Sequence, residues 1–156
     1  MLAQFEMDDS WHEALDDDVP APLDTVMREL FDAYRRADIE WILEHTDPDI
    51  EIAQPPELPG GNSYSGRGGL LDALLDWPRQ WEQFRIEPQR IFAVGDDHIA
   101  IVAIHRVKAR QIEIEVAAEI IWLMRWTGRC LSQWDMFMSV EAACEAARGR
   151  QRAAAM

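Results

Sequence analysis

The sequence predicts an α+β fold in which a curved antiparallel sheet and three helices enclose a conical pocket, with a further helix at the C-terminus. Two observations carry this prediction. Apolar residues first recur at helical spacing, in three segments, and after residue 84 they recur at strand spacing. Short turns at "GDD" and "TGR" then join the strands into an antiparallel meander. A chain of 156 residues, 48% of them apolar, suits one domain with a real core.

The elements follow from periodicity and from helix-breaking residues. The first half predicts a helix at 23–34, a short helix after a break at 37–38, a turn at 47–49, a strand at 50–54, a long irregular loop at 55–69 and a helix from 70 to about 78. The second half predicts strands at 84–94, 98–109, 111–126 and 131–138, then a helix at 139–150 capped by Ser139. Loops as long as the one at 55–69 are often functional.

Two strands carry information about burial. The strand at 111–126 places its even-numbered residues on an apolar face and several glutamates on the other face, which is expected to be mostly solvated. The strand at 98–109 is apolar on both faces, so its outer face should also be covered. A subunit interface would provide such a cover, and a homodimer is therefore expected.

The chain is strongly acidic, with a net charge of −14. Residues 1–20 form an acidic N-terminal arm with seven acids and no Lys or Arg; 21–150 form the domain and 151–156 a tail. A frayed arm is slightly favoured over one that folds across the domain through its apolar residues. This charge disfavours nucleic acids and anionic membranes as partners. No secretory signal or membrane-length apolar run is evident, so a cytoplasmic protein is expected.

Asp135 lies in the apolar strand segment "LSQWDMFM", residues 131–138. Burying a carboxylate on a wall of Leu, Trp, Met and Phe side chains is costly unless another group pairs with it. Side-chain alternation places Asp135 on one face with Gln133 and Phe137. Asp135 is therefore the first candidate functional residue.

Four segments together resemble the SnoaL-like branch of the NTF2-like superfamily. The resemblance spans roughly residues 23–147 and implies a cone-shaped fold around a pocket. It implies no single activity, because this fold hosts isomerases, cyclases, epoxide hydrolases, dehydratases and non-catalytic binders. The segments are "YRRADIEWILEHTDPDIEI" at 34–52, "YSGRGGLLDAL" at 64–74, "RIFAVGDDHIAIVAIHRVKAR" at 90–110 and "WLMRWTGRCLSQWDMF" at 122–137.

Ketosteroid isomerases of this superfamily use a base before a proline at the end of the first strand, and an acid pair on the first helix and a late strand. The matching positions here are Gln54, Leu30 and Trp122. An amide does not accept a proton at neutral pH, and the other two side chains are not acids. Ketosteroid isomerase chemistry is therefore not expected.

The resemblance to limonene-type epoxide hydrolases, which use two Asp residues bridged by an Arg, is closer. Asp135 falls on one Asp position and Arg106 on the Arg, whereas Lys108 replaces the second Asp. Of the water-positioning pair on the first strand, Gln54 is present and Ile52 replaces the other member. The resemblance implies that Arg106 neutralises Asp135 and that Asp135 transfers a proton. A structural ion pair without chemistry is equally favoured.

The remaining candidates are substrate-binding residues. Several tryptophans fall where the third helix and the strand at 111–126 meet the proposed pocket. Core packing explains most of them more simply, although tryptophans on a cavity wall would favour a flat, apolar ligand. The candidates are Gln54, Tyr64, Trp77, Trp81, Lys108, Trp122, Trp126 and Phe137.

The histidines are not expected to be catalytic. His105 has the opposite strand parity to Arg106, so a position facing outward or toward a subunit interface is favoured over a catalytic base. His12, His45 and His98 are expected to be solvated. No histidine or carboxylate spacing typical of a metal site occurs, so neither a metal nor a cofactor is expected.

Two classes of function therefore stay open. The first is a cofactor-free acid–base enzyme of the isomerase, cyclase or epoxide hydrolase type, acting on a small hydrophobic molecule. The second is a non-catalytic domain that binds a ligand or dimerises, which the missing second Asp favours. A purely structural dimerisation domain would fill the pocket with its own tryptophans and methionines.

Overall fold

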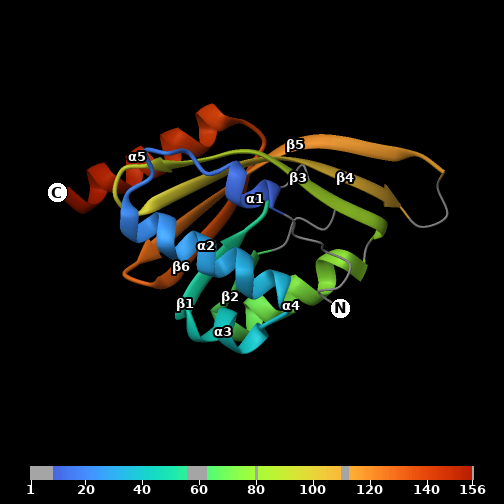
Figure 1. Cartoon of the computed structure of the whole chain (residues 1–156), viewed down its shortest axis with the longest axis horizontal. Coiled ribbons are helices and arrows are strands. Elements are labelled where there is room, and N and C mark those ends of the chain that lie inside the picture. The colour runs from blue at the N-terminus through green and yellow to red at the C-terminus, as the bar shows by residue number, and fades with distance from the viewer. Residues whose placement is uncertain (1–8, 56–62, 80, 110–112, 156) are drawn as a thin grey trace.

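A computed structural model describes residues 9–55, 63–79, 81–109 and 113–155. The helices are α1 (Ser10–Glu13), α2 (Ala21–Arg35), α3 (Ile39–Glu44), α4 (Gly66–Arg79) and α5 (Val140–Ala155). The strands are β1 (Thr46–Ala53), β2 (Ser63–Ser65), β3 (Trp81–Val94), β4 (His98–Ala109), β5 (Glu115–Thr127) and β6 (Cys130–Phe137). They form one curved sheet in the order β2-β1-β6-β5-β4-β3 (Figure 1). The predicted α+β fold is confirmed, and only the β1–β6 pair in this sheet is parallel.

The predicted helices and strands are present, but several bounds differ. The loop expected at 55–69 contains β2 and the first turn of α4, and the strands expected from 84 and 111 begin at Trp81 and Glu115. The turn expected at 47–49 lies inside β1, where the backbone N–H of Asp49 donates to Oδ1 of Asp47 at 2.8 Å and the register shifts. Ser139 caps α5 as expected, since its Oγ accepts from the N–H of Ala142 at 3.1 Å. The centre of the long loop, 56–62, lies outside the described residues. Within the described ranges no helix is long and apolar enough to cross a membrane.

The sheet has an inner face, whose side chains pack against α1–α4, and an outer face, which packs against α5 (Figure 1). The inner face forms the larger core. Each large apolar side chain buried there stabilises the fold by about 1.5–3 kcal/mol. Its most buried members include Trp11, Met27, Phe31, Ile50, Ile52, Leu70, Ile99 and Ile101.

The outer face is covered by α5 over part of β4, β5 and β6. Ala143 and Ala147 of α5 are fully buried there against Ala100, Ile121 and Leu123. Small alanine side chains let the helix approach the sheet closely. The cover predicted for the outer face of the strand at 98–109 is therefore supplied over this part by the chain's own last helix.

The N-terminal segment from residue 9 packs against the domain. Trp11 is 1% exposed and Leu15 is 6% exposed, and both belong to the inner core. The backbone N–H of Ile91 donates to the carbonyl of Ala14, and the N–H of Asp16 donates to the carbonyl of Ile91, both at 2.8 Å. The favoured expectation of a frayed arm is therefore wrong from residue 9 onward, because apolar burial and strand-like pairing hold this segment. The division at residues 20 and 150 stays a prediction.

Candidate functional site

Asp135 and Arg106, the predicted catalytic pair, have different partners. Asp135 is 7% exposed on the outer face, where the Arg150 guanidinium of α5 donates to its Oδ2. Arg106 donates to Oε1 of Glu87 at 2.9 Å and lies 3.8 Å from Oε1 of Glu115. The predicted Asp135–Arg106 ion pair is therefore wrong. The partner of Asp135 comes from α5, whereas the prediction considered only the strands. A catalytic role for either residue stays a prediction.

Asp135 ends a chain of polar contacts beneath α5. Asp97 accepts from Nε of Arg125 at 3.2 Å and contacts Nδ1 of His98 at 2.7 Å, while Nε2 of His98 lies 3.4 Å from Nη1 of Arg150. Burial raises the pKa of Asp135, and Arg150 opposes that change. Burial also lowers the pKa of His98, which is fully buried, so its expected solvation is wrong. These contacts favour the alternative of a structural pair, here one that attaches α5.

His105 lies on the inner face, not outward as expected. Its ring meets Phe84 and Trp122 edge-on, with centroids 6.2 and 5.4 Å apart. Burial among these rings lowers the pKa of His105 to about 4, so the imidazole is neutral at pH 7. The prediction failed because the odd-numbered side chains of β4, such as Ile99 and Ile101, are the ones that face the inner core.

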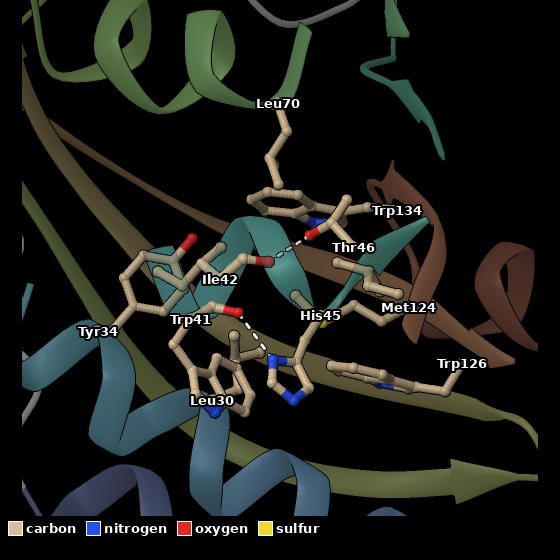
Figure 2. A pocket seen from close by; sticks show the side chains of 11 residues that line it. Leu30, Tyr34, Trp41, Ile42, His45, Thr46, Leu70, Met124, Trp126 and Trp134 are labelled. Atoms are coloured by element: carbon tan, nitrogen blue, oxygen red, sulfur yellow. Dashed lines mark hydrogen bonds between the residues drawn. The ribbon is translucent and has the colours of Figure 1, made fainter. Parts of the chain in front are cut away.

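A pocket opens between the inner face of the sheet and α2, α3 and α4 (Figure 2). The cavity is narrow, with a volume of about 10 Å³. That room suits about one water molecule. Its walls are almost entirely apolar or aromatic: Leu30, Tyr34, Trp41, Ile42, His45, Thr46, Leu70, Met124, Trp126, Leu131 and Trp134.

The structure defines the protonation or the hydrogen bonding of three polar side chains in this pocket. Nδ1 of His45 lies 2.8 Å from the Trp41 carbonyl oxygen, which can only accept, so Nδ1 carries a proton (Figure 2). In the neutral ring Nε2 then holds a lone pair. The hydroxyl of Thr46 donates to the carbonyl of Ile42 at 2.6 Å. Burial raises the pKa of Tyr34, which therefore stays protonated at neutral pH. His45 is half-buried, so it is only partly solvated.

Two tryptophans of the pocket bury their side-chain hydrogen-bond donors. Nε1 of Trp126 and Nε1 of Trp134 are inaccessible to solvent and have no partner within the described parts of the chain. A buried donor without a partner costs about 1–3 kcal/mol. An acceptor atom that came within hydrogen-bond distance of either Nε1 would recover that free energy, so the two indoles favour a ligand with an acceptor oxygen.

A family model described as a SnoaL-like domain matches residues 27–132. The chain belongs to the SnoaL-like domain family. The matched region begins within α2 and ends within β6, so it includes most of the pocket walls. The segment that carries α1 and the helix α5 both lie outside it. No curated protein matches the sequence of this SnoaL-like chain.

Solved structures similar to this SnoaL-like chain share its fold. TerC co-crystallised with polyporic acid is 18% identical, with a TM-score of 0.62 over 80% of this chain and 97% of TerC. An NTF2-like protein from Burkholderia thailandensis is 13% identical, with a TM-score of 0.64 over 78% and 94%. A putative SnoaL-like polyketide cyclase from Mesorhizobium loti is 14% identical, with a TM-score of 0.56 over 74% and 97%. The structural similarity establishes the NTF2-like fold. At identities this low it establishes no activity.

The predicted substrate-binding residues are divided between the two faces. Trp126 lines the pocket, whereas Trp122 packs in the neighbouring core and Tyr64 is half-buried against that core. Phe137 packs on the outer face with the residues under α5. Lys108 lies 3.7 Å from Glu113 and 4.0 Å from Glu82, in an open groove. The structure therefore does not gather these candidates into one site.

Three further candidates lie at element ends. Gln54 directly follows β1 and is half-buried, and Trp81 begins β3 with its indole N–H buried. Trp77 lies in α4, and its side chain is outside the described part. A role in ligand binding stays a prediction for each.

His45, Trp41 and Trp134 line the pocket but were not predicted from the sequence. A signal was present for the first two, because residues four apart on a helix share a face. Their rings stack at the C-terminal end of α3 with centroids 3.9 Å apart. Trp134 has the opposite strand parity to Asp135, so the prediction that the Asp135 face of β6 lines the pocket excluded it.

Proposed function

We propose that this SnoaL-like chain binds a small, largely apolar molecule with a carbonyl oxygen in the pocket of Figure 2. The observation that supports this proposal is the pair of buried indole N–H groups of Trp126 and Trp134 in a largely apolar wall. A carbonyl accepts such hydrogen bonds, while the rest of the ligand would contact the aromatic and aliphatic side chains.

The narrow pocket sets the size of the ligand. A molecule larger than water has to displace side chains. Half-buried ones are Trp41 of the six-residue helix α3 and His45, which directly follows that helix. A cyclic ketone of five or six ring atoms would displace fewer side chains than a polycyclic ketone, so we expect the smaller ligand. The TerC complex with polyporic acid and the putative polyketide cyclase support the choice of a small organic ligand.

The test compares cyclopentanone with cyclopentane, which has the same ring but no acceptor. Both are titrated into ¹⁵N-labelled protein while the indole N–H resonances of Trp126 and Trp134 are followed. Cyclopentanone is expected to bind more tightly and to shift at least one of these resonances downfield. Equal binding of the two compounds, or no response of either indole, would contradict the proposal and favour a domain without a ligand at this pocket.

A second candidate function is acid–base catalysis at the same pocket, which the state of His45 favours. With Nδ1 held by the Trp41 carbonyl, Nε2 can accept a proton from the carbon next to a ligand carbonyl. The electron pair of that C–H bond moves to the oxygen, where N–H donors would stabilise the enolate. The proton returns from His45 or from water, so the step is an isomerisation or an exchange without cofactor.

This candidate predicts that the protein accelerates deuterium uptake at C2 of cyclopentanone in D₂O. The variant His45→Gln should lose about 100-fold or more of this rate, because it removes the base. Cyclopentanone binding by the variant, measured through the Trp126 resonance, should persist. A binding protein without catalysis would show ligand binding and no exchange above the buffer rate.

A further inference from the structure

The ring of His98 lies among the polar contacts beneath α5, and its two neighbours set its protonation. Oδ1 of Asp97 lies 2.7 Å from Nδ1 of His98 and, as a carboxylate oxygen, can only accept, so Nδ1 carries a proton. In the neutral ring Nε2 then holds a lone pair. That lone pair faces Nη1 of Arg150, which can only donate, at 3.4 Å. The docked helix α5 is therefore matched to a neutral imidazole.

The charges around this ring balance only while it is neutral. The charged side chains that face it, within the described residues, come from the turn before β4, from β5, from β6 and from α5: Asp97, Arg125, Asp135 and Arg150. Two are carboxylates and two are guanidiniums. A proton on Nε2 of the buried His98 would add a third cation and point it at the Arg150 guanidinium. Burying an excess charge is costly, and Asp97 offsets only part of that cost.

Arg150 is the residue through which this ring acts on α5. It donates to Oδ2 of Asp135 while it contacts His98, and the neighbouring Gln151 donates to a carbonyl of β3 at 3.0 Å. The fully buried apolar contacts of α5 come from two small side chains: Ala143 and Ala147. Because alanines bury little apolar area, the polar end of α5 contributes much of its attachment. Repulsion at Arg150 would therefore weaken the docking of the whole helix.

We propose that His98 is a proton-sensitive latch for α5. The helix is docked on the outer face of the sheet while the ring is neutral, and it detaches when Nε2 takes up a proton. Detachment uncovers the apolar surface of β4 and β5 that α5 covers, which includes Ala100, Ile121 and Leu123. The latch lies on the face of the sheet opposite the ketone pocket.

The pKa directions give the sign of this response. Burial lowers the pKa of His98, Asp97 opposes that change, and the two guanidiniums add to it. The docked state is therefore favoured above the pKa of the detached ring, about 6.5, and this preference is lost as the pH falls through the docked pKa. Burial raises the pKa of Asp135, so protonation of that carboxyl favours docking instead. Of these two buried groups, only His98 accounts for release in acid.

The test uses Cys144 of α5, which packs partly buried against the outer-face residues. Cys130→Ser leaves it as the one thiol of the chain. Its reaction rate with 4,4′-dithiodipyridine is measured relative to that of glutathione at each pH. Between pH 7 and pH 5 this relative rate should rise about 10-fold, because the detachment equilibrium changes by up to about 10-fold per pH unit below about 6.5.

The deciding variant is His98→Gln in the same background. Its amide can donate to Asp97 and accept from Arg150 at every pH, so the relative rate should change by less than about 2-fold. The control His12→Gln, in which His98 is retained, should show the full rise. An equal rise in His98→Gln would overturn the proposal, as would the absence of a rise in the wild-type ring.

A measurement on the unsubstituted chain keeps the proposal testable if His98→Gln does not fold. The ¹⁵N resonances of the His98 ring report its protonation, and hydrogen exchange at the α5 amides, corrected for the intrinsic rate, reports docking. The two transitions should occur at the same pH. Release of α5 while the ring is neutral, or protonation of the ring while α5 stays docked, would overturn the proposal.

Discussion

The inner and outer faces of the sheet hold their helices by different interactions. The inner face packs aromatic and aliphatic rings and chains against α1–α4, whereas the outer face adds a chain of charged contacts from Arg125 to Asp135 beneath α5. Apolar contact is non-directional, so a ligand can replace a ring with little loss. A buried ion pair is directional, and removing one partner leaves an uncompensated charge. We therefore expect ligands on the inner face and attachment of α5 on the outer face.

The largest effect is expected from Arg150→Met, which retains the apolar stem and removes the charge that faces Asp135. At pH 7 it should lower the free energy of unfolding by about 3–5 kcal/mol, measured by urea denaturation. The matched control is Arg152→Met on the same helix, whose pair with Glu145 is exposed and should matter by less than about 0.5 kcal/mol. Equal effects would contradict the attachment role.

The pH dependence of that variant sharpens the comparison. Burial raises the folded-state pKa of Asp135 and Arg150 lowers it, so removing Arg150 raises this pKa further. The raised pKa contributes stability below the unfolded pKa, and this contribution is lost as pH rises through the folded pKa. The destabilisation by Arg150→Met should therefore shrink as the pH is lowered from 7 toward 4.

The sequence predicted the fold better than the site, for a physical reason. Hydrophobic periodicity indicates which residues are buried, so it predicted the apolar stripe of α2 and the strands of the meander. The residue type of Ser139 predicted the helix cap. Periodicity does not say which face of a strand is the inner one when both are apolar, as in β4. The wrong face was chosen from Asp135, and this placed His105 outside and Arg106 inside. Arg150 could not be paired with Asp135 because sequence spacing does not fix how α5 docks. The homodimer and the cytoplasmic location stay predictions.

An intermediate effect is expected from His105→Leu on the inner face. Burial lowers the pKa of His105 to about 4, so its contribution to stability is present above the unfolded pKa and is lost as pH falls through about 4. Between pH 7 and pH 4.5 the wild type should lose at least about 1 kcal/mol more stability than the variant. Denaturation curves at several pH values measure this. The partly exposed His12, changed to Gln, serves as the control, and equal slopes for both variants would contradict the burial of an uncharged His105.

A smaller effect is expected from Ser139→Ala at the N-terminus of α5. The change removes the acceptor for the N–H of Ala142 and should lower stability by about 1 kcal/mol. Urea denaturation measures it, and accelerated amide exchange should be confined to α5. Exchange that also increases in α2 or α3 would show that the two faces are not held independently.

The smallest effect on stability is expected from Trp126→Phe. The change removes part of a ring but also a buried N–H without a described partner, so the two contributions nearly cancel and stability should change by less than about 1 kcal/mol. Cyclopentanone affinity should nevertheless fall about 2- to 10-fold, the value of one hydrogen bond. Trp122→Phe, on the same face but outside the pocket, should retain the affinity. A loss of affinity in Trp122→Phe alone would place the ketone elsewhere.

The most direct measurement is a crystal structure of the protein with cyclopentanone. We expect the ring to lie among the side chains of Figure 2, with its carbonyl oxygen within about 3.2 Å of Nε1 of Trp126 or Trp134. A ketone bound beneath α5 near Asp135, or a pocket that stays closed at saturating ketone, would contradict it.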